Sequence, residues 1–305
     1  ATTSIVHYLS KTSLSKCPNN FKVHYKSRYT SGELQMRKYR WIVIIFLIGW
    51  TVFFVSCTKV QKKPIPVVSG VLNAKPVDVL IYTGSASWIT LENARVEAKT
   101  TKYLLESNGI RAAMTESEET LRNWMSETTA NGAVNVCILY GILPTSIYAP
   151  GNTEPDGSIV ENWIETTDGD TILNHADYLG YYSSDGTPNY KAPLQNLMDL
   201  PNIDINVEHF ENLFMHATES GSTLTPSLVN FESDRPFPLE QLGSEWYAEK
   251  IFASDTGDIQ ATLADPIILR DGDRGRLAMV HQTHHGDNPK GEVAAEIIIN
   301  YLLAK

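Results

Sequence analysis

The sequence predicts an α/β fold built on a doubly wound, mostly parallel sheet. Apolar runs with the length of buried parallel strands occur at 77–82, 110–114, 133–140 and 171–173. Segments with helical spacing lie between them. Because strands that alternate with helices form right-handed crossover units, this order predicts one sheet with helices on both faces.

The first half of the pattern has recognisable helix ends. The strand at 77–82 leads to a helix at 92–108, which Gly109 terminates as glycine does at many helix C-termini. A second helix begins where Thr115 or Ser117 can cap it, with acidic residues in its first turn. These signals support the strand–helix alternation.

The second half adds an antiparallel hairpin near the C-terminus. The later elements are helices at 158–167, 194–200 and 291–303, a strand at 171–173, and hairpin strands at 264–269 and 276–280. The intervening residues 270–275 contain Asp-Gly, which is a strong hairpin turn signal. Residues 201–245 show no clear period.

Residues 36–57 have the layout of a secretory signal. They read MRKYRWIVIIFLIGWTVFFVSC: a Met, basic residues, an uncharged apolar run and a Cys. The end resembles the lipobox of a bacterial lipoprotein, which implies lipidation at Cys57, although Phe54 stands where an aliphatic residue is usual. The alternative is an uncleaved membrane anchor. Both predict a protein tethered outside the cytoplasmic membrane, in the periplasm or on the cell surface.

This signal sets the expected domain organisation. We expect residues 1–35 to be a non-native leader from a start site placed too early, or a disordered tail. Residues 36–57 are the signal or anchor, 58–76 form a linker rich in Lys and Pro, and 77–305 form the α/β domain.

Charge argues against a nucleic-acid partner, and the cysteine positions argue against a disulfide in the domain. Eight of the 25 Lys and Arg residues, but one of the 35 acidic residues, precede Cys57, so the remainder carries 17 basic and 34 acidic residues. An acidic surface of this kind repels nucleic acid, so no nucleic-acid partner is expected. Cys17 and Cys57 precede the domain, which leaves Cys137 alone there without a disulfide partner.

The domain resembles the class I glutamine amidotransferase-like superfamily, and within it the ThuA-like (trehalose-utilisation) branch. Four segments carry the resemblance, VDVLIYTG, VNVCILYG, ENWIETTDGDTILNHADYLG and RGRLAMVHQTHH. The resemblance covers most of 77–305 and implies a flavodoxin-like doubly wound sheet. The chain departs from the amidotransferases at the nucleophile, because the turn at 174–177 has no Cys and Cys137 lies inside a strand. Glutaminase activity is therefore not expected.

Candidate catalytic residues lie where strands end. His175 and Asp177 follow one strand, and His281, His284 and His285 follow the last one. Ligands of open α/β sheets bind at the carboxyl ends of strands, so the two groups are expected to share one edge. We interpret His175, Asp177 and His281 as candidate catalytic residues, and the three late histidines as side chains that could bind a divalent metal. The alternatives are a polar loop with one structural histidine and a hydrogen-bonding role in a ligand pocket.

Candidate ligand-binding residues lie in the neighbouring loops. They are Gly84, Ser85, Trp88, Tyr140, Gly141 and Tyr178, with further exposed-looking rings at Tyr148, Tyr181 and Tyr182. Aromatic faces beside carboxylates and amides are typical of carbohydrate sites. Alternatively, the rings cover the edge of the sheet.

Three functions remain open from the sequence. The first is a membrane-tethered domain that binds a carbohydrate or another small polar ligand without a resident cofactor. The second is a hydrolase or isomerase that uses the His and Asp side chains, with or without a divalent metal. The third is a non-catalytic interaction module.

Overall fold

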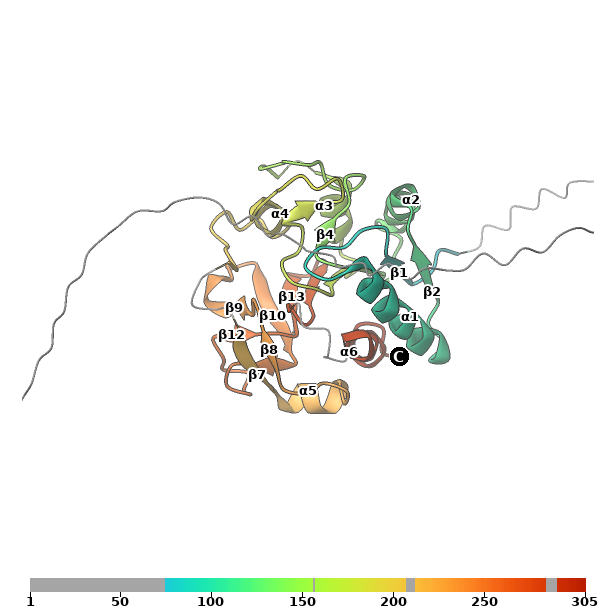
Figure 1. Cartoon of the computed structure of the whole chain (residues 1–305). Helices are drawn as coiled ribbons and strands as arrows, with labels where there is room; N and C mark the ends of the chain where they lie inside the picture. The colour runs from blue at the N-terminus through green and yellow to red at the C-terminus, as the bar shows by residue number, and fades with distance from the viewer. Residues whose placement is uncertain (1–74, 156, 207–211, 284–289) are drawn as a thin grey trace, which may run out of the picture. The chain divides into compact units, whose positions relative to one another are not determined.

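The computed structural model describes residues 75–155, 157–206, 212–283 and 290–305. These residues form a mixed α/β structure with a large, mostly parallel sheet and a separate antiparallel sheet (Figure 1). The lipobox and Cys57 lie outside the described residues. Within the described ranges, no helix has the length and apolarity that a membrane crossing requires.

The larger sheet has seven strands in the described chain, in the order β10-β13-β14-β5-β3-β1-β2. Five of them pair in parallel: β2 (Ala112–Thr115), β1 (Val79–Tyr82), β3 (Val136–Leu139), β5 (Thr171–Asn174) and β14 (Arg276–Met279). The antiparallel strands β13 (Ile267–Asp271) and β10 (Trp246–Ile251) complete one edge. The order reverses between β1 and β3, so a topological switch point lies there.

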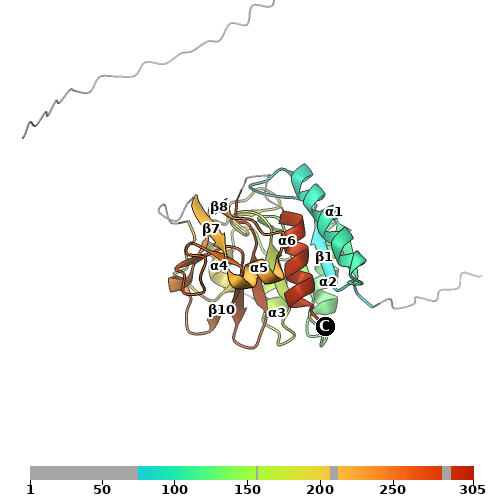
Figure 2. The ribbon, with the colours of Figure 1, turned by 90° about the horizontal axis from the view of Figure 1, so that it is seen from below.

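Helices cover both faces of this sheet (Figures 1 and 2). One face carries α1 (Leu91–Ser107) and α6 (Lys290–Ile297), which lie side by side, with α6 continued by the π-helical segment η3 (Ile298–Leu302). The other carries α2 (Glu118–Thr128), α3 (Ile159–Ile164) and α4 (Ala192–Leu197). Along β1, Val79 and Ile81 pack with the first group, and Leu80 and Tyr82 with the second. This alternation is what a two-sided apolar strand produces.

The helix starts follow their capping residues. The Thr90 side chain accepts a hydrogen bond from the backbone N–H of Asn93 at the start of α1. Ser117 caps α2 in the same way, and Ser158 and Glu161 form a capping box at α3. Each cap satisfies a backbone donor that has no partner within the helix.

The antiparallel sheet contains five short strands in the order β8-β7-β11-β12-β9. They are β8 (Phe231–Ser233), β7 (Leu213–Ala217), β11 (Ala253–Ser254), β12 (Leu263–Ala264) and β9 (Phe237–Pro238). The helix α5 (Glu219–Leu224) connects β7 to β8, and the 3-10 turn η2 (Leu239–Gln241) leads from β9 to β10 of the larger sheet. The strands β4 (Ile142–Leu143) and β6 (Tyr182–Ser183) pair in parallel with each other.

The mixed α/β prediction with a mostly parallel sheet and a late hairpin is confirmed. One local prediction was wrong. The expected strand 264–269 is divided at Asp265–Pro266 into β12 and β13, which belong to different sheets. Proline has no N–H for a ladder, which explains why pairing is interrupted there. Much of the antiparallel sheet falls in 201–245, where strands of two to five residues are too short to show a period.

Candidate functional site

The carboxyl ends of β3, β5 and β14 bring the predicted polar residues to one edge. Leu139 pairs with Asn174, and Asn174 with Met279, so the residues that follow each strand are neighbours. The backbone continues this pairing, because the N–H of His175 donates to the Leu139 carbonyl.

His175 and His281 are both fully buried. The His175 ring lies edge-on to Tyr140 at 5.3 Å between centroids, and the His281 ring lies 4.4 Å from that of Phe231. Burial, helped by the charge of Lys290 and partly offset by the Lys290 backbone, lowers the pKa of His175 to about 3. Burial and the nearby charges of His175 and Lys290 hold the pKa of His281 well below its usual range. The two imidazoles are therefore neutral at neutral pH and lie close enough to interact.

The histidine environment is polar but closed. Among the described residues, no ring nitrogen of either histidine has a hydrogen-bond partner of ordinary geometry. His281 adopts a φ of 48°, which is an unusual conformation for a non-glycine residue. Because their exposed fractions are 0%, the rings do not line an open surface in this structure.

Asp265 and Lys290 join the antiparallel sheet to this edge. Asp265 accepts hydrogen bonds from the Ser233 hydroxyl and the Gln282 N–H, each at 2.6 Å. Burial raises the pKa of Asp265 to about 7, against the lowering effect of these hydrogen bonds and of the Lys290 charge. Lys290, which is 2% exposed, donates to the Thr283 carbonyl. These hydrogen bonds hold the segment after β14 against the rest of the domain.

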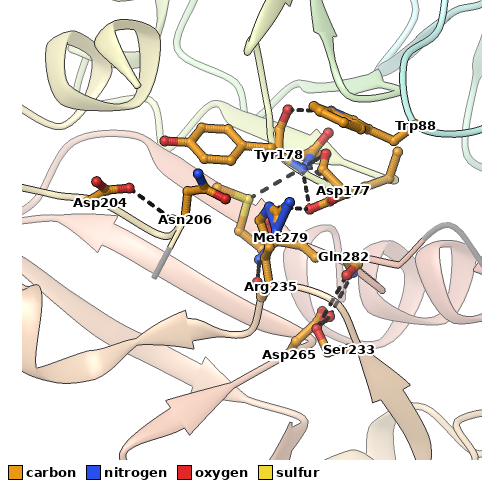
Figure 3. A network of polar contacts seen from close by, with 12 residues as sticks. Trp88, Asp177, Tyr178, Asp204, Asn206, Ser233, Arg235, Asp265, Met279 and Gln282 are labelled. Carbon is orange, nitrogen blue, oxygen red and sulfur yellow. Dashed lines mark hydrogen bonds and ion pairs between the residues drawn. The ribbon is translucent and has the colours of Figure 1, made fainter. Parts of the chain in front are cut away.

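Asp177 lies between this buried group and the surface. Its carboxylate accepts a hydrogen bond from the Tyr178 N–H at 2.7 Å and lies 3.5 Å from the Arg235 guanidinium. Figure 3 shows Asp177 and Arg235 between Tyr178 on one side and the Gln282, Asp265 and Ser233 group on the other. Asp177 thus contacts an arginine and its own turn.

The loops at the switch point pack against each other. The Trp88 indole N–H donates to the Tyr178 carbonyl at 3.2 Å, and the Tyr82 and Ser85 hydroxyls lie 3.3 Å apart. Gly141 has a φ of 71°, and a Cβ there would lie 2.8 Å from the Ser87 carbonyl oxygen. Gly141 is thus required by the close approach of the two loops.

An open cavity of about 160 Å³ lies beside this packed region. We call it the tyrosine cavity; its lining residues are Tyr178, Tyr181, Tyr190, Lys191, Asp204 and Asn206. Tyr181 is its central ring, with edge-on contacts to Tyr178 at 5.3 Å and to Tyr190 at 5.5 Å. Tyr190 is 59% exposed, whereas Tyr178 is 1% exposed. Polar groups complete the wall: Lys191 lies 3.7 Å from Asp204, which accepts a hydrogen bond from the Asn206 N–H.

The structure separates the predicted site residues into three groups. His175, Asp177, His281 and Tyr140 share the buried strand edge; Gly84, Ser85, Trp88 and Gly141 form the packed loops; Tyr178 reaches the tyrosine cavity. The expectation of exposed rings was wrong for Tyr148 and Tyr178, which are 1% exposed because the core and neighbouring loops cover them. Lys191, Asp204 and Asn206 were missed, and the only sequence signal for this area was the density of tyrosines between 178 and 190.

The structure describes only part of the predicted metal site, together with the one cysteine of the domain. His284 and His285 lie outside the described residues. Within the described part of the chain, no group of three or more His, Cys, Asp or Glu side chains could hold a metal ion. Cys137 lies in β3 and is fully buried, and burial raises the pKa of its thiol far above the usual range. A thiol in that environment stays protonated and unreactive.

Comparison with known proteins gives little information about function. No family model matches the chain, and no curated protein matches it. One similar solved structure is a protein from Bacteroides uniformis ATCC 8492, provisionally described as ThuA-like. It has a TM-score of 0.38 and 9% sequence identity, and the match covers 73% of this chain and 91% of that one. The function must therefore be inferred from the residues of the site.

Proposed function

We propose that this domain binds a small polyhydroxylated ligand, of the carbohydrate class, in the tyrosine cavity. The observation that carries the proposal is a cavity lined by three tyrosine rings together with an ammonium, a carboxylate and an amide side chain. Sugar rings offer apolar faces to aromatic rings and hydroxyls to polar side chains, and this wall provides both. The parallel order of β2, β1, β3, β5 and β14 supports a flavodoxin-like core, in agreement with the ThuA-like sequence resemblance.

The position of the cavity also supports binding. Tyr178 follows Asp177 at the carboxyl end of β5, which is the edge where open α/β sheets bind ligands. The buried group of His175, His281, Asp265 and Lys290 lies behind that edge. Its hydrogen bonds hold Ser233, Gln282 and Thr283 at this edge, so we assign it a structural role behind the cavity in this proposal.

We also propose that the domain is tethered outside the cytoplasmic membrane through Cys57. The support is the signal layout of residues 36–57 and the Lys- and Pro-containing linker after it. In a bacterial host fed radiolabelled palmitate, wild-type protein is expected to carry label and Cys57→Ser to lose it. Cys137→Ser is the matched control and should label like wild type. Equal labelling of Cys57→Ser and wild type would contradict the tether at Cys57.

A variant of the exposed ring tests the cavity. A thermal-shift screen of sugars identifies ligands, because a ligand that binds only the native state raises the melting temperature. Tyr190→Ala is expected to weaken the best ligand about three- to tenfold in calorimetric titration, the loss of one aromatic contact worth roughly 0.5–1.5 kcal/mol.

The control is Tyr103→Ala on α1, because Tyr103 is 70% exposed and does not line the cavity. Its affinity should equal that of wild type. Equal affinities of wild type and Tyr190→Ala would place binding elsewhere, and a screen without any stabilising sugar would remove the carbohydrate proposal.

A further inference from the structure

The charges in the wall of the tyrosine cavity are paired. Lys191 and Asp204 lie 3.7 Å apart, with side chains 53% and 37% exposed. They are neighbours in space although they are 13 positions apart in the chain, since α4 and the turn after it bring 204 back beside 191. An ionised ligand group that approached either side chain would meet the opposite charge and the like charge together.

The next charges inward are paired as well. Arg235 lies 3.5 Å from Asp177, and their side chains are only 16% and 6% exposed. Both act on the Tyr178 phenol, where Arg235 favours the ionised form and Asp177 opposes it. Across the two pairs, the cations and anions balance, so the described residues give the cavity no excess of either sign.

The inner end of the cavity offers a hydroxyl. Tyr178 is 1% exposed and lines the cavity, and its hydroxyl has no hydrogen-bond partner among the described residues. Figure 3 shows the hydroxyl end of the ring directed to the side where Asp204 and Asn206 lie. Burial, with the Asp204 charge next in size, raises the pKa of Tyr178, so the group is a neutral donor and acceptor at neutral pH. A buried hydroxyl of this kind gains most from a ligand hydroxyl.

We infer that the tyrosine cavity selects an uncharged sugar over its acidic and amino counterparts, and that the buried Tyr178 hydroxyl recognises one of the sugar hydroxyls. The inference rests on the proposed function. A carboxylate on the ligand would have to displace Asp204 from Lys191 and lie beside the displaced acid. An ammonium on the ligand would have to displace Lys191 from Asp204 and lie beside the displaced cation. A neutral polyol leaves both pairs intact and uses the tyrosine faces and the phenol.

Matched sugars test the selection. The probes are glucose, galactose and mannose, each compared with its uronic acid and its 2-amino sugar. Titrations with the full chain at low salt and about pH 6 keep both kinds of derivative ionised. At least one neutral hexose is expected to bind, with its two charged counterparts roughly tenfold weaker or more. A uronic acid or amino sugar that binds more tightly than its neutral parent would overturn the selection and leave carbohydrate binding standing. Binding by none of the nine probes would overturn the proposed function itself.

A second variant tests the hydroxyl. Tyr178→Phe keeps the ring and removes only the phenol, and it is expected to weaken the neutral sugar roughly three- to tenfold. Tyr103→Phe is the matched control and should bind like wild type. If Tyr178→Phe folds and keeps wild-type affinity, the role of the hydroxyl is overturned. If the variant fails to fold, binding by a monodeoxy series of the same hexose decides. Loss of affinity at one deoxy position with the wild-type protein supports a hydrogen bond to that sugar hydroxyl, and equal affinities along the series overturn it.

Discussion

Replacing Asp265 with asparagine is expected to change how the stability of the domain depends on pH. Asp265 is fully buried, and burial raises its pKa from an ordinary value of 3.8 to about 7. Below the unfolded-state pKa the carboxyl is protonated in both states. As the pH rises toward 7, the unfolded chain releases the proton and the folded protein keeps it. The contribution of Asp265 to stability is therefore present in acid and lost as the pH rises through about 7.

Asparagine does not titrate, so the variant does not lose this contribution to stability as the pH rises. At about 1.4 kcal/mol per unit of pKa shift, the free energy of unfolding of the variant relative to wild type should rise by about 4 kcal/mol between roughly pH 4 and pH 8. Urea unfolding of both proteins across this range measures it. Both proteins must be measured because His175, whose pKa is lowered, makes the stability of each fall in acid. This common trend cancels in the difference between them. A difference between variant and wild type that stays constant with pH would contradict the account of Asp265.

Replacing Glu249 with alanine is expected to lower the free energy of unfolding by about 3 kcal/mol. The pairing of β10 with β13 is irregular between Ala248 and Lys250, so Glu249 occupies a bulge. Bulges redirect a side chain, and here Glu249 accepts hydrogen bonds from both Arg270 and Arg276. The Glu249 and Arg276 side chains are each 13% exposed, so the loss of Glu249 leaves guanidinium charge nearly buried.

Chemical unfolding at neutral pH measures this effect. Glu245→Ala is the control, because Glu245 is exposed and its backbone carbonyl, which alanine retains, accepts the hydrogen bond from the Gly272 N–H. Burial raises the pKa of Glu249, but the hydrogen bonds and charges of Arg276 and Arg270 outweigh it and lower the pKa overall. This stabilisation is present above the unfolded-state pKa of Glu249 and is lost as the pH falls through the folded-state pKa. The free energies of unfolding of the two variants should therefore converge in acid. Equal stability of Glu249→Ala and Glu245→Ala at neutral pH would refute the role of the pair.

The central sheet could be predicted because its strands are apolar on both faces. Val79 to Tyr82 and Val136 to Leu139 are buried at every position, which a run of apolar residues indicates. The helix predicted at 92–108 agrees with α1 within one residue. Its ends are set by neighbouring residues, with Thr90 capping the start and Gly109 following the end. Local chemistry decides such elements.

The cavity could not be predicted because its wall depends on contacts between distant segments. Asp204 lies in a stretch without a period, and only the folded chain places it beside Lys191. Tyr178 and Tyr190 have the same residue type in the sequence, yet one is buried and the other is exposed. Burial of a ring in a loop depends on what packs over it, and a single sequence does not encode that locally.

Chemical-shift mapping tests the central claim most directly. Titration of the stabilising neutral sugar into isotope-labelled protein, followed through amide and tyrosine ring signals, is expected to shift Tyr178, Tyr181, Tyr190 and Asn206, with little change at Tyr103 on the far helix α1. Shifts that cluster away from the tyrosine cavity, with these residues unchanged at saturation, would contradict the assignment of this cavity as the binding site.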